Sequence, residues 1–183
     1  MQLLHFLVIS ALSLVPLTAA SQLSDVGPPA CDSPTVVSER FIGANKDVKV
    51  QAIHCEGDEA VRAAKRQTPP SNVCGDTNCF PPAGGGPDPN ECHVISDALL
   101  FDSENVGALF TIPVNASVVT MQYRSCKSFF KNQDVSDEQY CRTDWAAVLD
   151  FVAFNCQATQ NAHGGLCVAA DQRWFIQVQN SSG

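Results

Sequence analysis

A cluster of side chains that could bind a sugar lies near the end of this 183-residue chain. It combines amide, imidazole, carboxylate, guanidinium and indole groups, at Asn161, His163, Asp171, Gln172, Arg173 and Trp174. Planar polar groups hydrogen-bond sugar hydroxyls, and an aromatic ring packs on the apolar face of a pyranose. The pattern therefore indicates a candidate carbohydrate-binding site. The alternative, which residue chemistry alone favours, is that Trp174 belongs to the core and its neighbours form a solvated strand end.

Residues suited to catalysis are few. From Gln67 onward the only histidines are His93 and His163, and no Gly-x-Ser-x-Gly, His-Glu-x-x-His or phosphate-loop motif is present. Glu91 could join the two histidines as acid and base of a small ribonuclease, but helix capping already explains it. We therefore expect a protein that is not an enzyme and that uses no cofactor or metal. A small secreted hydrolase ranks third among the functions considered.

Cysteine usage predicts disulfides. Nine cysteines occur, and no two have the Cys-x-x-Cys spacing of metal or redox sites. Cys31 and Cys55 precede Gln67, and seven candidates for disulfides follow it: Cys74, Cys79, Cys92, Cys126, Cys141, Cys156 and Cys167. Seven is odd, so one thiol either stays free or pairs between chains. The sequence leaves the connectivity open.

The chain reads as a secreted precursor in three parts. Residues 1–20 are apolar and free of acidic side chains, which is typical of a signal peptide cleaved after Ala20. Residues 21–66 form a propeptide or linker that ends in the dibasic processing pair Lys65-Arg66. Residues 67–183 form the mature domain. No later segment is apolar for long enough to cross a membrane, so we expect a secreted, extracellular product.

Charge limits the partners. Residues 67–183 carry five Lys and Arg against twelve Asp and Glu. Nucleic acids and anionic membrane surfaces are bound through Lys and Arg, so we expect neither as a partner, and no membrane insertion. Asn115 and Asn180 each begin a glycosylation sequon at a turn or terminus, where a transferase could reach them.

Hydrophobic periodicity predicts an α+β fold. Residues 67–89 are rich in Pro and Gly and should form an extended arm. A helix capped by Asp88 should run to about Ser103, and a second should run from Thr143 to about Gln157. Strands are expected at residues 107–112, 117–123, 125–130 and 172–179. The prediction is a mainly antiparallel sheet with two main helices, stabilised by disulfides.

Seven short segments of the mature region carry a resemblance to a known family. They are Cys74-Gly75-Asp76, Gly84-Gly85-Gly86-Pro87-Asp88-Pro89-Asn90, Cys92-His93-Val94-Ile95, Tyr123-Arg124-Ser125-Cys126, Tyr140-Cys141-Arg142-Thr143-Asp144-Trp145, Gln160-Asn161-Ala162-His163-Gly164-Gly165 and Asp171-Gln172-Arg173-Trp174-Phe175-Ile176. Together they resemble the small secreted mushroom glycan-binding proteins with a "Y-three"-like domain.

This resemblance implies a lectin-like protein with an α/β/α-type sandwich that acts against viruses or animal cells. It implies recognition of fucosylated, GalNAc-containing glycans and a homodimer formed by extending the antiparallel sheet. The Gln-rich final strand, residues 172–179, could be the sheet edge that such a dimer needs.

A fainter resemblance is to fungal killer-toxin-like and effector domains, which also combine a short Cys-rich chain with an aromatic final strand. It implies a toxin or necrosis-inducing secreted effector. The closer segment matches favour the first family. We therefore expect a secreted fungal, non-catalytic glycan-binding protein, with the effector as the alternative.

Overall fold

The computed structural model describes residues 31, 33–56 and 74–182. Seven strands form one antiparallel sheet in the order β1-β2-β5-β6-β9-β8-β3. Their bounds are β1 Pro34–Ile42, β2 Val48–Cys55, β3 Cys74–Cys79, β5 Val118–Tyr123, β6 Cys126–Asn132, β8 Gly165–Ala169 and β9 Trp174–Asn180. Two short strands, β4 (Leu109–Ile112) and β7 (Glu138–Cys141), pair in a separate small sheet. Single turns of 3-10 helix lie at Val114–Ala116 and Ala158–Gln160.

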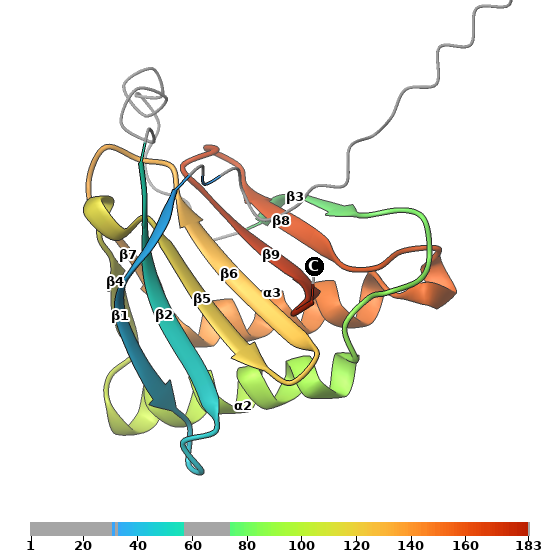
Figure 1. The fold of residues 1–183 in the computed structure, drawn as a ribbon, viewed down its shortest axis with the longest axis horizontal. Helices are drawn as coiled ribbons and strands as arrows, with labels where there is room; N and C mark the ends of the chain where they lie inside the picture. The colour runs from blue at the N-terminus through green and yellow to red at the C-terminus, as the bar shows by residue number, and fades with distance from the viewer. Residues whose placement is uncertain (1–30, 32, 57–73, 183) are drawn as a thin grey trace, which may run out of the picture.

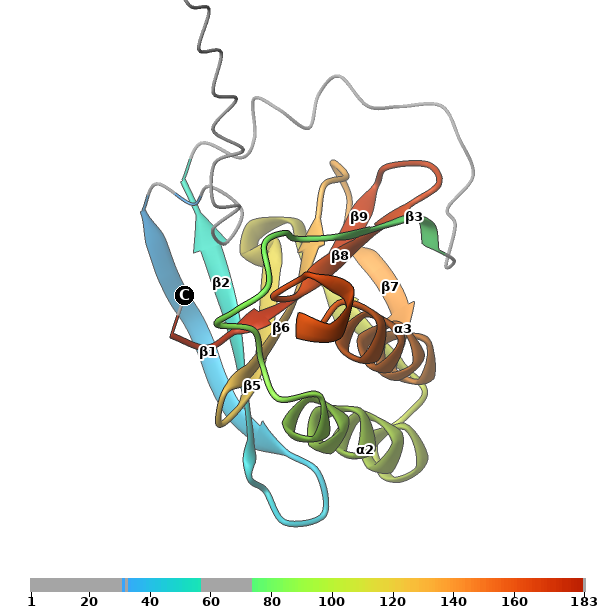
Figure 2. The ribbon, with the colours of Figure 1, turned by 90° about the vertical axis from the view of Figure 1, so that its right-hand side faces the viewer.

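Two helices, α2 (Pro89–Asn105) and α3 (Arg142–Asn155), pack side by side on one face of the large sheet (Figures 1 and 2). α2 begins as expected, because the Asp88 side chain accepts a hydrogen bond of 2.8 Å from the Asn90 amide. The second helix is also present, and it turns an apolar stripe to the core, with Trp145, Leu149 and Val152 fully buried. The buried faces of α2 and α3 and the sheet face that they cover enclose the main core.

The coarse fold class is therefore α+β, as expected, but the arrangement differs from the expectation in two respects. Both described helices cover the same face of the sheet (Figure 2), so the described residues show two layers and not an α/β/α sandwich. The final strand β9 pairs with both β6 and β8, so it is an interior strand and not an edge. The edges of the described sheet are β1 and β3.

The segment expected to be a propeptide or linker supplies two strands of the sheet. β1 and β2 form a hairpin, and β2 pairs with β5 from Lys49–Gln122 to Ile53–Val118. The alternation in β2 explains this, because Val48 and Val50 face the core while Lys49 and Gln51 lie on the opposite face. The expected signal peptide (1–20) and the Lys65-Arg66 pair lie outside the described residues.

Four disulfides are present: Cys31–Cys55, Cys74–Cys167, Cys79–Cys156 and Cys92–Cys126. Within the expected arm, residues 74–79 form the strand β3, which two of these bonds fix to β8 and to the end of α3. Cys141 is the ninth cysteine and stands outside them as a free thiol. Disulfides of this number fit an oxidising compartment. Within the part of the chain that the structure describes, no helix is long and apolar enough to span a membrane.

Candidate functional site

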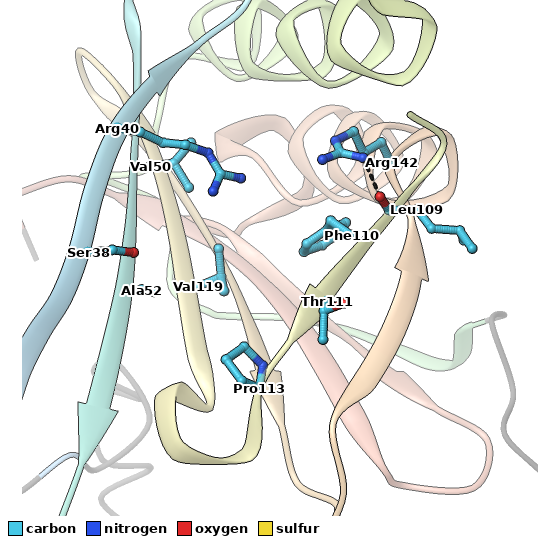
Figure 3. A pocket seen from close by; sticks show the side chains of 10 residues that line it. All are labelled: Ser38, Arg40, Val50, Ala52, Leu109, Phe110, Thr111, Pro113, Val119 and Arg142. Atoms are coloured by element: carbon cyan, nitrogen blue, oxygen red, sulfur yellow. Dashed lines mark hydrogen bonds between the residues drawn. The ribbon is translucent and has the colours of Figure 1, made fainter. Parts of the chain in front are cut away.

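A cavity of about 440 Å³ lies between the β1–β2 hairpin and the region where β4 meets the start of α3 (Figure 3). Its lining comes from the β1–β2 hairpin, from residues 109–113, from β5 and from the start of α3. The lining residues are Ser38, Arg40, Val50, Ala52, Leu109, Phe110, Thr111, Pro113, Val119 and Arg142. The size falls in the range of small-molecule sites, which are mostly apolar with a few converging polar groups. We refer to it as the arginine pocket.

Arg142 forms one wall of the arginine pocket and is 7% exposed. Its Nη1 donates hydrogen bonds to the carbonyl oxygens of Gly107 and Leu109, and its guanidinium carbon lies 5.6 Å from the centre of the Phe110 ring. Burial lowers the pKa of Arg142; nearby Asp102 opposes this effect and Arg40 adds to it. Because arginine starts from so high a pKa, the group still carries its charge. The wall therefore presents a fixed, desolvated cation.

Arg40 extends from β1 into the same hollow, as Figure 3 shows. Within the described parts of the chain its guanidinium has no hydrogen bond or ion pair to a side chain. The lining contains no carboxylate. Two positive groups thus approach one cavity, without a neutralising side chain in its wall, in a protein with a formal net charge of −8.

Packed aromatic rings form the floor of the arginine pocket. Phe110 stacks on Trp145 with 5.3 Å between ring centres, and its edge meets Phe130 at 6.4 Å. Trp145 is fixed in turn by a 3.0 Å hydrogen bond from its Nε1 to Ser128 Oγ. Phe110 is only 9% exposed, so the floor of the pocket is a rigid part of the core.

The six residues expected to form a sugar site do not come together. Asn161 and His163 precede β8 and bind the segment before α2: Asn161 Oδ1 accepts from the Ala83 amide at 3.1 Å, and His163 Nδ1 lies 2.7 Å from the Pro82 carbonyl oxygen. Asp171 and Gln172 lie in the turn after β8. The five residues of β8, about 17 Å of extended chain, separate the two groups.

Arg173 and Trp174 both contact other residues inside the protein. Arg173 forms an ion pair with Asp134 and lies 3.9 Å from Glu138, and both carboxylates are 5% exposed. Trp174 is fully buried, 5.3 Å from the Phe130 ring and 4.8 Å from the Tyr140 ring. Its ring cannot stack on a sugar in this structure, so the core interpretation of Trp174 is the correct one.

The two buried carboxylates next to Arg173 have opposite pKa shifts. Burial alone would raise the pKa of Asp134, but hydrogen bonds from the Val135 amide, Arg173 and Ser136, together with the charge of Arg173, lower it. Burial raises the pKa of Glu138, and Arg173 only partly opposes this. The cluster is a structural ion network where β7 and β9 begin.

The groups considered as acid and base have separate partners. Glu91 accepts hydrogen bonds from the amide and hydroxyl of Ser125, which lower its pKa. His93 Nδ1 lies 3.0 Å from Asp150, which also accepts a 2.7 Å bond from the buried Ser96 hydroxyl. The Ser96 hydroxyl therefore points to the carboxylate and not to His93. No group of three potential metal ligands occurs among the described residues.

The two sequon asparagines differ. Asn115 is exposed, in the short 3-10 turn Val114–Ala116. Asn180 is half-buried, and its Nδ2, the atom that would carry a glycan, donates a 3.2 Å hydrogen bond to the Gly86 carbonyl.

The candidate residues of the sequence do not include Arg40 and Arg142. Arg40 lies in the segment assigned to a propeptide or linker, and Arg142 looks like an ordinary first residue of a helix. One pattern in the sequence does indicate that the segment around Arg40 is folded. Val48, Val50 and Ala52 alternate with polar residues, as in a half-buried strand.

No family model matches this chain, and no curated protein does either.

Proposed function

We propose that this chain is a secreted, non-catalytic glycan-binding protein and that the arginine pocket is its ligand site. The observation that carries the proposal is the combination of groups in one cavity. Hydroxyls of Ser38 and Thr111 and the guanidinium of Arg40 can hydrogen-bond sugar hydroxyls, while the exposed Leu109 and the half-buried Pro113 supply apolar lining. A cavity of about 440 Å³ has room for one or two sugar rings.

The fucosylated, GalNAc-containing glycans implied by the resemblance are the first ligands to test. A homodimer that extends the sheet would have to join at β1 or β3. We place it at β1, because this strand is the longer of the two edges and exposes Val36 and Val37. Measuring the mass in solution as a function of concentration tests the dimer separately from ligand binding.

The test of the glycan-binding proposal is a glycan-array screen of the oxidised protein from Ser21 onward, which retains both walls of the pocket. We expect selective binding that is weakened at least tenfold by Thr111→Val and Arg40→Ala. Thr77→Val, on the exposed edge strand β3 and away from the pocket, is the matched control. A blank array from folded protein, combined with damage to membranes or plant tissue that sugars do not inhibit, would favour the effector alternative.

A further inference from the structure

The arginine pocket carries positive charge only, although acidic residues outnumber basic ones by 19 to 11 in the chain. From this contrast we infer that the pocket binds an anionic sugar, one that bears a carboxylate or a sulfate ester placed between Arg40 and Arg142. The inference rests on the glycan-binding function proposed above and names the class of glycan.

The geometry of Arg142 supports an anion at this position. Both of its hydrogen bonds to carbonyl groups use Nη1, and those carbonyls and Phe110 fix the plane of the guanidinium. Its buried position strengthens a charge-assisted bond to a ligand, because little water competes there. A fixed planar guanidinium suits the paired oxygens of a carboxylate or sulfate.

Arg40 supplies the second positive charge from the opposite wall (Figure 3). It lies on the exposed strand β1 and has no side-chain partner within the described residues, so it is free to approach a ligand. Repulsion between the two guanidinium groups is relieved when an anion lies between them. The rest of the lining, with Phe110, Pro113 and Val119 beside two hydroxyls, suits a sugar ring better than a bare inorganic ion.

Calorimetry with three matched oligosaccharides tests this inference. They share one sequence and end in glucose, glucuronic acid or 6-sulfoglucose. We expect at least tenfold tighter binding of an acidic form than of the neutral form, and the preferred acid distinguishes carboxylate from sulfate. Arg40→Gln should remove this preference without changing the melting temperature. Lys46→Gln, which removes one charge from the same hairpin outside the pocket, should keep it.

The outcomes separate the two proposals. Equal binding of neutral and acidic sugars would overturn the anionic class and leave glycan binding intact. A protein that binds no sugar on the array but binds an aliphatic carboxylate in an Arg40-dependent way would overturn the glycan function and keep the anion site.

A second inference comes from the disulfides. Cys31–Cys55 closes within the β1–β2 segment, and the other three bonds all lie between Cys74 and Cys167. No disulfide of the structure crosses from residues 31–56 to residues 74–182. The Lys65-Arg66 pair lies between these two segments in the sequence, outside the described residues.

The β1–β2 hairpin is nevertheless part of the folded core. Ile42, Val48 and Val50 are at most 3% exposed and belong to the same cluster as Leu99 and Met121. At the other end of the hairpin, Cys55 packs on Val118 and Phe129.

The turn of the hairpin also contacts α2. The Gly43 amide donates a 3.3 Å hydrogen bond to Asp102 Oδ1. A Cβ at Gly43 would come within 2.8 Å of Ala98 Cβ, so the turn lies directly against the helix. Gly43 has a φ of +86°, which also favours glycine there.

We propose that cutting after Lys65-Arg66 yields a two-chain protein in which residues 31–56 stay bound without a covalent link. The bound segment continues to cover the edge of β5 and to supply Arg40, Val50 and Ala52 to the arginine pocket. On this proposal, the segment that looks like a discarded leader is a permanent part of the functional protein.

The test is digestion of the purified oxidised protein with a dibasic-specific protease, followed by gel filtration. We expect both fragments to coelute in native buffer and to separate in denaturant without any reductant. The double variant Lys65→Ala, Arg66→Ala lacks the dibasic pair and serves as the uncut control. Val48→Asp should leave the cut chains unable to coelute. Separation in native buffer, a need for reductant, or resistance of the Lys65-Arg66 site to the protease would each overturn the proposal.

Discussion

At the scale of single residues, Trp174 shows how burial decides between two roles for the same ring. The indole lies against Phe130 and Tyr140 and has no exposed surface. Trp174→Ala should lower the free energy of unfolding by about 3–5 kcal/mol, a large part of the stability of a small domain. Circular dichroism during thermal unfolding measures this. A variant that melts at the wild-type temperature would contradict the core role.

Arg173 gives a residue-scale prediction that depends on pH. Arg173→Gln removes the cation from the buried Asp134 and Glu138, and should cost about 3 kcal/mol at pH 7. Urea denaturation at pH 7 and pH 4 measures the loss. The exposed Arg124→Gln, whose pair with Glu91 is 3.7 Å long, should change stability by less than about 0.5 kcal/mol.

The direction of the pH effect follows from the two pKa shifts. The pKa of Asp134 is lower in the folded than in the unfolded protein. Its contribution to stability is therefore present above the unfolded pKa and is lost as pH falls through the folded pKa. The pKa of Glu138 is raised from its usual 4.5. Its contribution to stability is therefore present below pH 4.5 and is lost as pH rises through the folded pKa. Protonation of Glu138 removes one buried charge, so Arg173→Gln should cost less at pH 4 than at pH 7. Equal losses at both pH values would contradict this account.

At the scale of secondary-structure elements, the β1–β2 hairpin gives a prediction with a control on the same hairpin. Val48 is fully buried against the core, whereas Val37 is 58% exposed on β1. Val48→Ala should lower the free energy of unfolding by about 2 kcal/mol, and Val37→Ala should change it by less than about 0.5 kcal/mol. Chemical denaturation of the uncut chain measures both. Equal effects would mean that the hairpin is not integrated in the core.

At the scale of the whole molecule, the disulfides predict one thiol per chain. Eight of the nine cysteines are paired, and partial burial, together with the nearby Asp144 carboxylate, raises the pKa of the Cys141 thiol. Ellman's reagent should titrate one thiol in denaturant and react slowly with the native protein. Cys141→Ser should abolish the signal. A disulfide-linked dimer that this variant loses would show that Cys141 pairs between chains instead.

The local elements of this protein are encoded in short stretches of its sequence. Both helices, the Asp88 cap and most of the central strands follow from hydrophobic period and turn residues, because these signals act between near neighbours. The number of cysteines and the charge balance likewise indicate a disulfide-rich, acidic protein.

Which elements meet depends on contacts between distant parts of the chain. β9 is interior because β8 pairs on its far side, and Trp174 is core because β9 faces α3. The arginine pocket needs Arg40 and Arg142 to meet across a hundred residues of sequence, and the pairing of β2 with β5 brings them together. Strand pairing over such separations depends on the packing of the whole chain, so no local pattern records it.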